Sequence, residues 1–330
     1  MSRWARLLAA SERAMPWVSL GTSIVSAVWM DRSEAQGPWV AAAAAGSWLV
    51  FVVLSFAHRL PSTPQAKPYG RLHKLLRFGS TAASQSLLQL PLFFSAPFYF
   101  QASVFTPLQC AFGALFVVAL AISAWDPWCS RALLKPVFGP ALLAFASFVG
   151  FNAALPMLGV PHRTAAWITA GVVGFAIPAV HIAGGALGRQ RLSALLVGLS
   201  VPLLLAVGGI SAVPPAPLRV MSSGIGTQVV DRTLIDPHAH FARSPGALVC
   251  FSAVRAPHGL KDRLFHVWSL NGTEFYRLEL KVEGGRRAGF RTWSRASLPR
   301  AAEGIVQCSV ETGLGQTMAR TQVSLGAQSL

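Results

Sequence analysis

The chain has 330 residues, of which 53% are hydrophobic and only 12% charged, and its formal net charge at pH 7 is +16. This composition is too apolar for an ordinary soluble protein of this length. The positive charge would suggest nucleic acid in a soluble protein, but much of it lies in loops beside apolar stretches, so no nucleic-acid partner is expected.

Seven apolar stretches occupy the first two-thirds of the sequence. A long run with few charges satisfies its backbone in a lipid bilayer only as a helix. The stretches therefore predict an α-helical polytopic membrane bundle of about seven transmembrane helices over residues 1–212. The predicted spans are approximately 15–30, 38–57, 80–100, 106–125, 137–158, 165–187 and 192–212.

The short loops predict the orientation of these helices. With the N-terminus inside, twelve loop Lys and Arg residues are cytoplasmic and only Arg32 and Arg163 are outside. This asymmetry predicts a multi-pass protein of the bacterial inner (cytoplasmic) membrane, with a cytoplasmic N-terminus and a periplasmic C-terminal region. The first stretch could instead be a signal peptide, and its cleavage would leave the C-terminal region on the same side.

Polar residues are scarce inside the predicted spans, which hold no Asp, Glu, Lys or Arg. Gln85 and Gln89 lie four residues apart on one helical face, and we expect them to join helices by hydrogen bonds. His181 is the one titratable side chain in a span, and we interpret it as a packed histidine rather than a proton relay.

Residues 213–245 are predicted to be a linker, because they begin with a Pro-rich run and continue with Ser and Gly. His238 and His240 form a His-x-His motif like that of amidohydrolases, in which both histidines bind a metal. Only 90 residues follow His240, too few for the barrel that would supply the other ligands. We therefore expect no metal site and no cofactor.

Residues 246–330 predict a small all-β domain, because alternating apolar residues recur between turn signals. Asn271-Gly272 is the strongest hairpin signal in the chain. About six strands suit an immunoglobulin-like sandwich. The expected strands are Ala247 to Arg255, Leu264 to Leu270, Glu274 to Val282, Arg287 to Ser294, Ile305 to Glu311 and Gln316 to Ser324.

Two of the four cysteines, Cys250 and Cys308, lie in this β-domain. In an oxidising periplasm they could form a disulfide, although the sequence alone leaves two buried thiols as the alternative.

The β-domain contains, in this order, Cys250-Phe251, His266-Val267-Trp268 before Asn271-Gly272, Arg291-Thr292-Trp293-Ser294, and Gly304. In these motifs it resembles the bacterial domain of unknown function 2914. Val306 stands where that family commonly has a tryptophan. The membrane region more weakly resembles the domain of unknown function 5924 family, and neither resemblance implies an activity.

Strand alternation predicts which side chains are available for binding. If the Asn271-Gly272 loop keeps the pairing parity even, Phe265 and Val267 enter the core and the neighbouring aromatic and cationic residues face outward. A bulge or a three-residue loop would reverse the parity and bury Trp268. The predicted binding residues are His266, Trp268, Phe275, Arg277, Arg291 and Trp293.

These observations favour a non-enzymatic membrane protein over an enzyme, since no nucleophile, base and orienting group recur at a specific spacing. We expect the β-sandwich to bind a periplasmic protein, peptide or glycan, or to act in envelope assembly, with the lipid bilayer as the other partner. The alternative is a transport or membrane-processing component whose site lies among the helices, around Gln85, Gln89 and His181.

Overall fold

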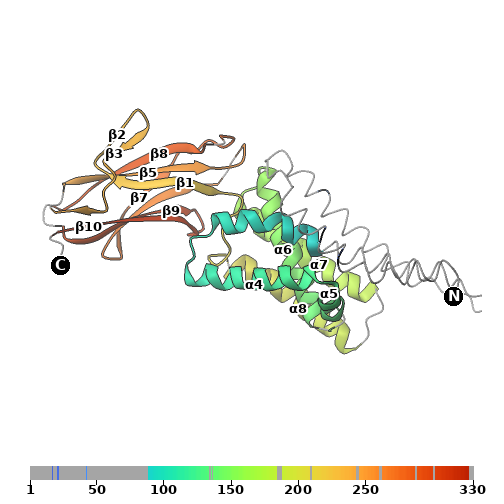
Figure 1. Cartoon of the computed structure of the whole chain (residues 1–330). Coiled ribbons are helices and arrows are strands. Elements are labelled where there is room, and N and C mark those ends of the chain that lie inside the picture. The colour runs from blue at the N-terminus through green and yellow to red at the C-terminus, as the bar shows by residue number, and fades with distance from the viewer. Residues whose placement is uncertain are drawn as a thin grey trace, which may run out of the picture. The chain divides into compact units, whose positions relative to one another are not determined.

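A computed structural model of the chain was analysed. It describes residues 17, 21, 42, 88–133, 135, 137–183, 188–208, 210–242, 245–259, 262–286, 288–299 and 302–326. The chain divides into two compact units (Figure 1). One unit contains most of the helices, and the other contains all the described strands, together with residues 98–112 and 159–163.

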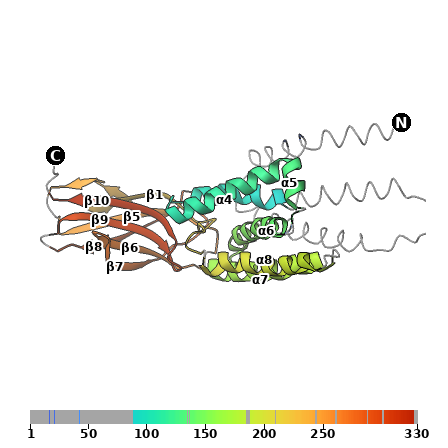
Figure 2. The same cartoon turned by 90° about the horizontal axis from the view of Figure 1, so that it is seen from below.

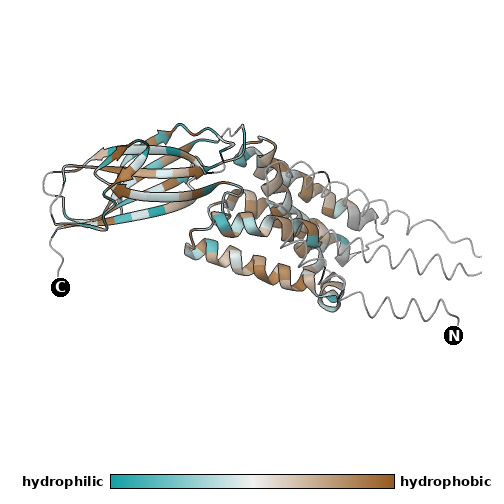
Figure 3. Ribbon diagram, turned by 45° about the horizontal axis from the view of Figure 1, so that its top comes forward, coloured by the Kyte–Doolittle hydropathy of each residue, from teal (hydrophilic) through white to brown (hydrophobic). Residues whose placement is uncertain are grey.

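The helices form from long runs of Ala, Leu, Val and Phe, which leave no polar group but the backbone to satisfy. One helix covers residues 88–102. The others are α4 (Pro107–Ala124), α5 (Asp126–Leu133), α6 (Phe138–Met157), α7 (His162–Ala183) and α8 (Arg189–Leu203), the last followed by a π-helical turn, Leu204–Gly208. Figure 3 shows how uniformly hydrophobic most of these helices are.

Small residues permit close helix packing. A Cβ atom on Gly198 of α8 would lie 2.8 Å from Pro178 and 3.1 Å from Ile177, both on α7. Gly150 of α6 likewise has no room for a Cβ beside Pro91. Glycine lets helix backbones approach closely in this way.

The predicted bundle of seven transmembrane helices is wrong, since no such bundle is present in the described residues. There, only α4 and α6 are long and apolar enough to cross a membrane. Helix α8 is shorter, begins with two arginines and ends at a π-helical turn. Apart from residues 17, 21 and 42, the predicted spans 15–30 and 38–57 lie outside the described residues, as does the start of the span 80–100.

The error arises because an apolar run has the same appearance whether it faces lipid or protein. Helix α6 illustrates this, since 78% of its most apolar window is buried inside the protein. A core helix and a membrane span thus meet the same criterion of length and hydropathy. The coarser conclusion that remains is that two helices among the described residues could cross a membrane.

The β-rich unit contains ten strands in its described part. They are β1 (Arg219–Gly226), β2 (Gln228–Val230), β3 (Thr233–Ile235), β4 (His240–Phe241), β5 (Ala247–Arg255), β6 (Leu264–Leu270), β7 (Thr273–Leu280), β8 (Phe290–Ser297), β9 (Gly304–Thr312) and β10 (Thr317–Leu325). Six of them, β5 to β10, lie where the sequence predicted strands, two with identical bounds.

Two sheets make up the sandwich (Figure 2). One has the order β1-β5-β8 and the other β4-β10-β9-β6-β7, so β8 and β7 are edge strands. Strands β2 and β3 form a separate hairpin. All pairings are antiparallel except the short contact of β4 with β10.

The core lies between the two sheets, where alternate residues of each strand point inward, as the alternating colours of the strands in Figure 3 indicate. One core cluster contains Leu248 and Cys250 from one sheet and Trp268, Val306 and Cys308 from the other. Burying such side chains contributes roughly 1.5–3 kcal/mol for each large one.

The segment 213–245 is more than the predicted linker. Four strands form within it, and β1 pairs with β5 along its whole length, apart from one irregularity between Val220 and Ser222. Ile225 of β1 is fully enclosed in the core. The sequence did not predict this strand for two reasons. The segment begins with a Pro-rich run, and β1 itself is rich in Ser and Gly and shows little apolar alternation.

A buried histidine ties the segment 159–163 to the rest of the β-rich unit. His162 Nδ1 lies 2.6 Å from Oδ2 of Asp262, and its Nε2 lies 2.9 Å from the carbonyl oxygen of Ala216. The His162 amide also donates to Asp262, at 3.0 Å. Both ring nitrogens thus lie within hydrogen-bond distance of oxygen atoms of the β-rich unit.

Candidate functional site

Two of the predicted binding residues lie in the core. His266 and Trp268 are both 0% exposed. The Nε2 of His266 lies 2.8 Å from Oγ of Ser252, and its Nδ1 lies 2.8 Å from Oγ of Ser294. Trp268 Nε1 donates to the same Ser294 oxygen at 2.9 Å. The expected outward orientation of these two side chains is therefore wrong.

The reason is the alternative that the sequence left open. The loop Asn271-Gly272 has two residues, but the pairing shifts between Trp268 and Ser269, so that Trp268 faces Tyr276 while Ser269 faces Glu274. Phe275 is the extra residue. Such a bulge reverses the faces of every residue before it and turns Trp268 inward.

The buried side chains around His266 are not accessible to a substrate. Burial lowers the pKa of His266 from 6.5 to about 4, so the ring is neutral at pH 7. A serine beside a neutral histidine is the chemistry of a nucleophile and its base, but Ser252 and Ser294 are also enclosed. We interpret these residues as the polar centre of the core.

Cys250 and Cys308 form a disulfide that links β5 to β9 and thereby joins the two sheets, with their Cα atoms 6.4 Å apart. His266 and the two sulfurs lie within 4.8 Å of one another, and no other group of three potential metal ligands occurs in the described residues. Because the disulfide uses both sulfurs, they cannot act as thiolate ligands.

Arg277, on edge strand β7, is engaged with neighbouring carboxylates. Its Nε donates to Oε1 of Glu274 at 2.9 Å, and its Nη2 lies 3.5 Å from Oε2 of Glu311. The hydrogen bond from Arg277 lowers the pKa of Glu274, whereas burial raises that of Glu311 despite the same arginine. The guanidinium also lies 5.6 Å from the ring centroid of Phe265. Phe275 is exposed nearby in sequence.

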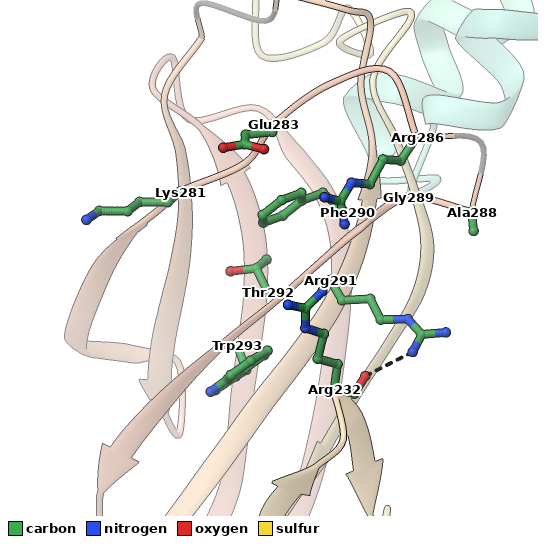
Figure 4. Close-up of a pocket in the computed structure, with 10 residues that line it drawn as sticks. All are labelled: Arg232, Lys281, Glu283, Arg286, Ala288, Gly289, Phe290, Arg291, Thr292 and Trp293. Atoms are coloured by element: carbon green, nitrogen blue, oxygen red, sulfur yellow. Dashed lines mark hydrogen bonds between the residues drawn. The ribbon is translucent and has the colours of Figure 1, made fainter.

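The last two predicted residues, Arg291 and Trp293, lie together on an open groove along β8 (Figure 4). They alternate with the inward-facing Thr292 and Ser294. The groove has a volume of about 670 Å³. Its lining consists of Arg232, Lys281, Glu283, Arg286, Ala288, Gly289, Phe290, Arg291, Thr292 and Trp293.

Three parts of the chain build this groove. Strand β8 pairs only with β5, so its other edge is open. The connection from β7 to β8 supplies Lys281, Glu283, Arg286, Ala288 and Gly289. The turn between β2 and β3 supplies Arg232, whose backbone has a φ of 57°. Arg291 Nη1 donates to the carbonyl oxygen of Arg232 at 3.3 Å and thus holds that turn beside β8.

Glycines fix the connection from β7 to β8. A Cβ atom on Gly284 would overlap the carbonyl group of Pro257, so no other residue fits there without a backbone shift. Gly285 has a φ of 89°, and its amide donates to Ala256 at 3.0 Å. These contacts hold Glu283 and Arg286 at the edge of the groove.

The groove has a strong positive charge. Four cations and one carboxylate line it, which leaves a formal charge of 4 − 1 = +3. Arg286 stacks on Phe290, with the guanidinium 5.0 Å from the ring centroid. Over the described ranges, no ion pair involves Arg232, Lys281, Arg286 or Arg291. In this they differ from Arg277.

Sequence reasoning found Arg291 and Trp293 but missed the other cations of this groove. Arg232 lies in the segment that was predicted to be a linker, so nothing connected it to β8. Arg286 follows Gly284-Gly285, and this turn signal next to a basic residue could have drawn attention to it.

Gln85, Gln89 and His181 are the polar candidate residues that were predicted to lie inside membrane spans. The Gln89 side-chain amide donates to the backbone oxygen of Ser123 at 2.8 Å, which links two helices. Gln85 lies outside the described residues, as does the side chain of His181, whose backbone belongs to α7. A groove of about 810 Å³ lies between α7 and α8, and its lining includes no ionisable residue.

Comparison with known families finds two matching regions in the chain. The model of a family described as Family of unknown function (DUF5924) matches residues 1–244, and that of Protein of unknown function (DUF2914) matches residues 261–324. The chain belongs to the DUF5924 family. Its C-terminal part carries a DUF2914 region, so both resemblances seen in the sequence are confirmed.

No curated protein and no solved structure matches the chain. The two family descriptions name no activity, substrate or partner. For this DUF5924 protein, an inference about function therefore rests on its own groove and core.

Proposed function

We propose that this protein is a non-enzymatic component of the bacterial envelope, in which membrane-associated helices carry a β-sandwich that binds a ligand on the periplasmic side. The observation that carries the proposal is the groove along β8, where an exposed tryptophan lies among four cations that have no carboxylate partner in the described part of the chain.

Exposed tryptophan and arginine are the residues that most often dominate binding energy. Trp293 is 45% exposed and lies on the outer face of β8, whose alternate residues are buried in the core. The exposed part of the indole brings no folding benefit, because its apolar surface stays hydrated. A binding role explains its place better than a role in stability.

The disulfide supports the periplasmic location. A bond such as Cys250–Cys308 persists in an oxidising compartment and is rare in the bacterial cytosol.

Site-specific photo-crosslinking in living cells tests the proposal. A photoreactive phenylalanine derivative replaces Trp293 in the full-length protein, and a second protein carries it at Ile305, which is 50% exposed on β9, outside the groove lining. We expect defined adducts from position 293 and none of the same mass from position 305. Identical adducts from both positions, or none from position 293, would contradict a binding role for the groove.

A further inference from the structure

The chemistry of the groove points to the class of ligand. Its formal charge of +3 comes from β8, the connection from β7 to β8 and the turn between β2 and β3, and the cationic side chains make no ion pairs among the described residues. Charges of the same sign repel one another only weakly in water. Cations gathered in one groove nevertheless repel one another more strongly than cations spread over the surface. A bound anion removes that repulsion.

The donors suit an anion with several oxygens. Arg232 and Arg291 lie side by side, joined by the hydrogen bond from the Arg291 guanidinium to the Arg232 backbone (Figure 4). That bond uses one of the five N–H groups of Arg291. The others, with the guanidinium of Arg232, remain able to donate to a ligand, and planar guanidinium groups match the oxygens of phosphate in pairs.

Phosphate satisfies this site better than a carboxylate does. A carboxylate carries one charge and two oxygens, whereas a phosphate group carries one or two charges and presents three oxygens when it is a monoester. Lys281 and Arg286, which also line the groove, provide further charge for a second phosphate or for the same group. One carboxylate would leave most of the +3 charge uncompensated.

The aromatic residues add a place for the rest of the ligand. Phe290 is covered by Arg286, but Trp293 leaves 45% of its surface in solvent at the end of the cationic stretch. An indole of this kind packs on an apolar chain or on the face of a sugar ring. The volume of about 670 Å³ is that of a site for a small ligand or for one unit of a larger one.

We infer that the groove along β8 binds a phosphate ester, with Arg232 and Arg291 as the main phosphate ligands and Trp293 against the adjoining part of the molecule. This inference rests on the proposed function and specifies its ligand. The phosphate belongs either to a membrane lipid headgroup or to a soluble phosphate ester, and the experiment separates these sources.

The test uses the full-length protein in nanodiscs of phosphatidylcholine at low salt. One arm titrates glycerol 1-phosphate and inorganic pyrophosphate by calorimetry. The other arm measures retention of fluorescent vesicles, with and without phosphatidylglycerol, on the immobilised nanodiscs. Four proteins are compared: the wild type and the substitutions Arg232→Gln, Arg291→Gln and Arg295→Gln.

Arg295 is a matched control, because it is exposed on β8 four residues after Arg291 but does not line the groove. Its substitution removes the same charge from the same strand. We expect Arg232→Gln and Arg291→Gln each to weaken binding about tenfold, and Arg295→Gln to weaken it less than about twofold. The arm that shows this difference identifies the source of the phosphate.

Two results would overturn the inference: no binding in either arm, or equal weakening by all three substitutions, which indicates only diffuse charge attraction. The crosslinking experiment distinguishes this failure from that of the proposed function. Position-specific adducts at residue 293 without phosphate binding would leave a binding domain whose ligand is of another class. Absence of such adducts would remove the binding domain itself.

Discussion

His266 Nδ1, on β6, lies 2.8 Å from Oγ of Ser294, on β8, and so connects the two sheets of the sandwich through its core. The other ring nitrogen lies 2.8 Å from Ser252 of β5. A single neutral imidazole thus spans the interior between the sheets. Protonation of the His266 ring in this buried position would cost free energy, because the charge would be removed from water.

Stability should therefore fall with acid. Burial lowers the His266 pKa to about 4, against 6.5 for an unperturbed histidine. Between these values the unfolded chain binds more protons, so the contribution of His266 is fully present above pH 6.5 and is lost as the pH falls to 4. The loss is about 3 kcal/mol in total. Denaturant unfolding of the full-length protein in detergent, repeated from pH 7.5 to pH 4, measures it.

His266→Gln is the control for this pH dependence, because glutamine keeps a hydrogen-bonding side chain but does not titrate. It should be less stable at pH 7 and should lose less stability on acidification. Glu311, with its raised pKa, is present in both proteins and cancels in the comparison. Equal pH slopes for the two proteins would show that His266 is not the responsible group.

The two tryptophans should differ in what their removal costs. Trp268→Ala opens a cavity in the core and should lower the free energy of unfolding by about 3–5 kcal/mol. Trp293→Ala should change it by no more than about 0.5 kcal/mol, because that ring is half-exposed. Relative to the stability that each substitution costs, Trp293→Ala should weaken ligand binding more than Trp268→Ala does. A large loss of stability in Trp293→Ala would favour a structural role for this ring.

Removing the disulfide should weaken the sandwich. The bond joins residues 58 apart in sequence, and replacing both cysteines by alanine should cost about 4 kcal/mol on the chain-entropy estimate. Cys110→Ala removes an exposed free thiol and should have no comparable effect. Urea unfolding of the three proteins provides the comparison, and equal midpoints would contradict a stabilising disulfide.

Gly284→Ala should affect the groove directly. Its methyl group would overlap the carbonyl of Pro257, so the connection that positions Glu283 and Arg286 must move. We expect weaker ligand binding together with earlier proteolysis in this connection. Gly246→Ala is a useful comparison, since that glycine has positive φ but no atom near its Cβ position, and it should affect local stability without affecting binding.

How far the sequence predicts this fold differs between its two parts. The hairpin at Asn271-Gly272 and the bounds of β5 and β6 follow from turn chemistry and apolar runs, which are local signals. The bulge that buries Trp268 depends on pairing between strands, so the sequence could present it only as an alternative. The groove combines Arg232 with Arg291, 59 residues away, and no local pattern joins them.

The helical region shows the opposite difficulty. Its apolar runs are clear, but hydropathy does not separate a helix packed in protein, such as α6, from one that faces lipid. The count of membrane spans was therefore wrong, although helices do occupy residues 88–203 apart from short gaps and connections.

The location of the groove is the claim on which the whole account depends, and thiol labelling measures it. Ala288 is exposed in the groove lining, and Ala288→Cys is made in a protein in which Cys110 and Cys129, the two cysteines outside the disulfide, are replaced by alanine. Intact spheroplasts are treated with a membrane-impermeant maleimide. We predict labelling equal to that of lysed cells, and labelling that occurs only after lysis would contradict a periplasmic binding domain.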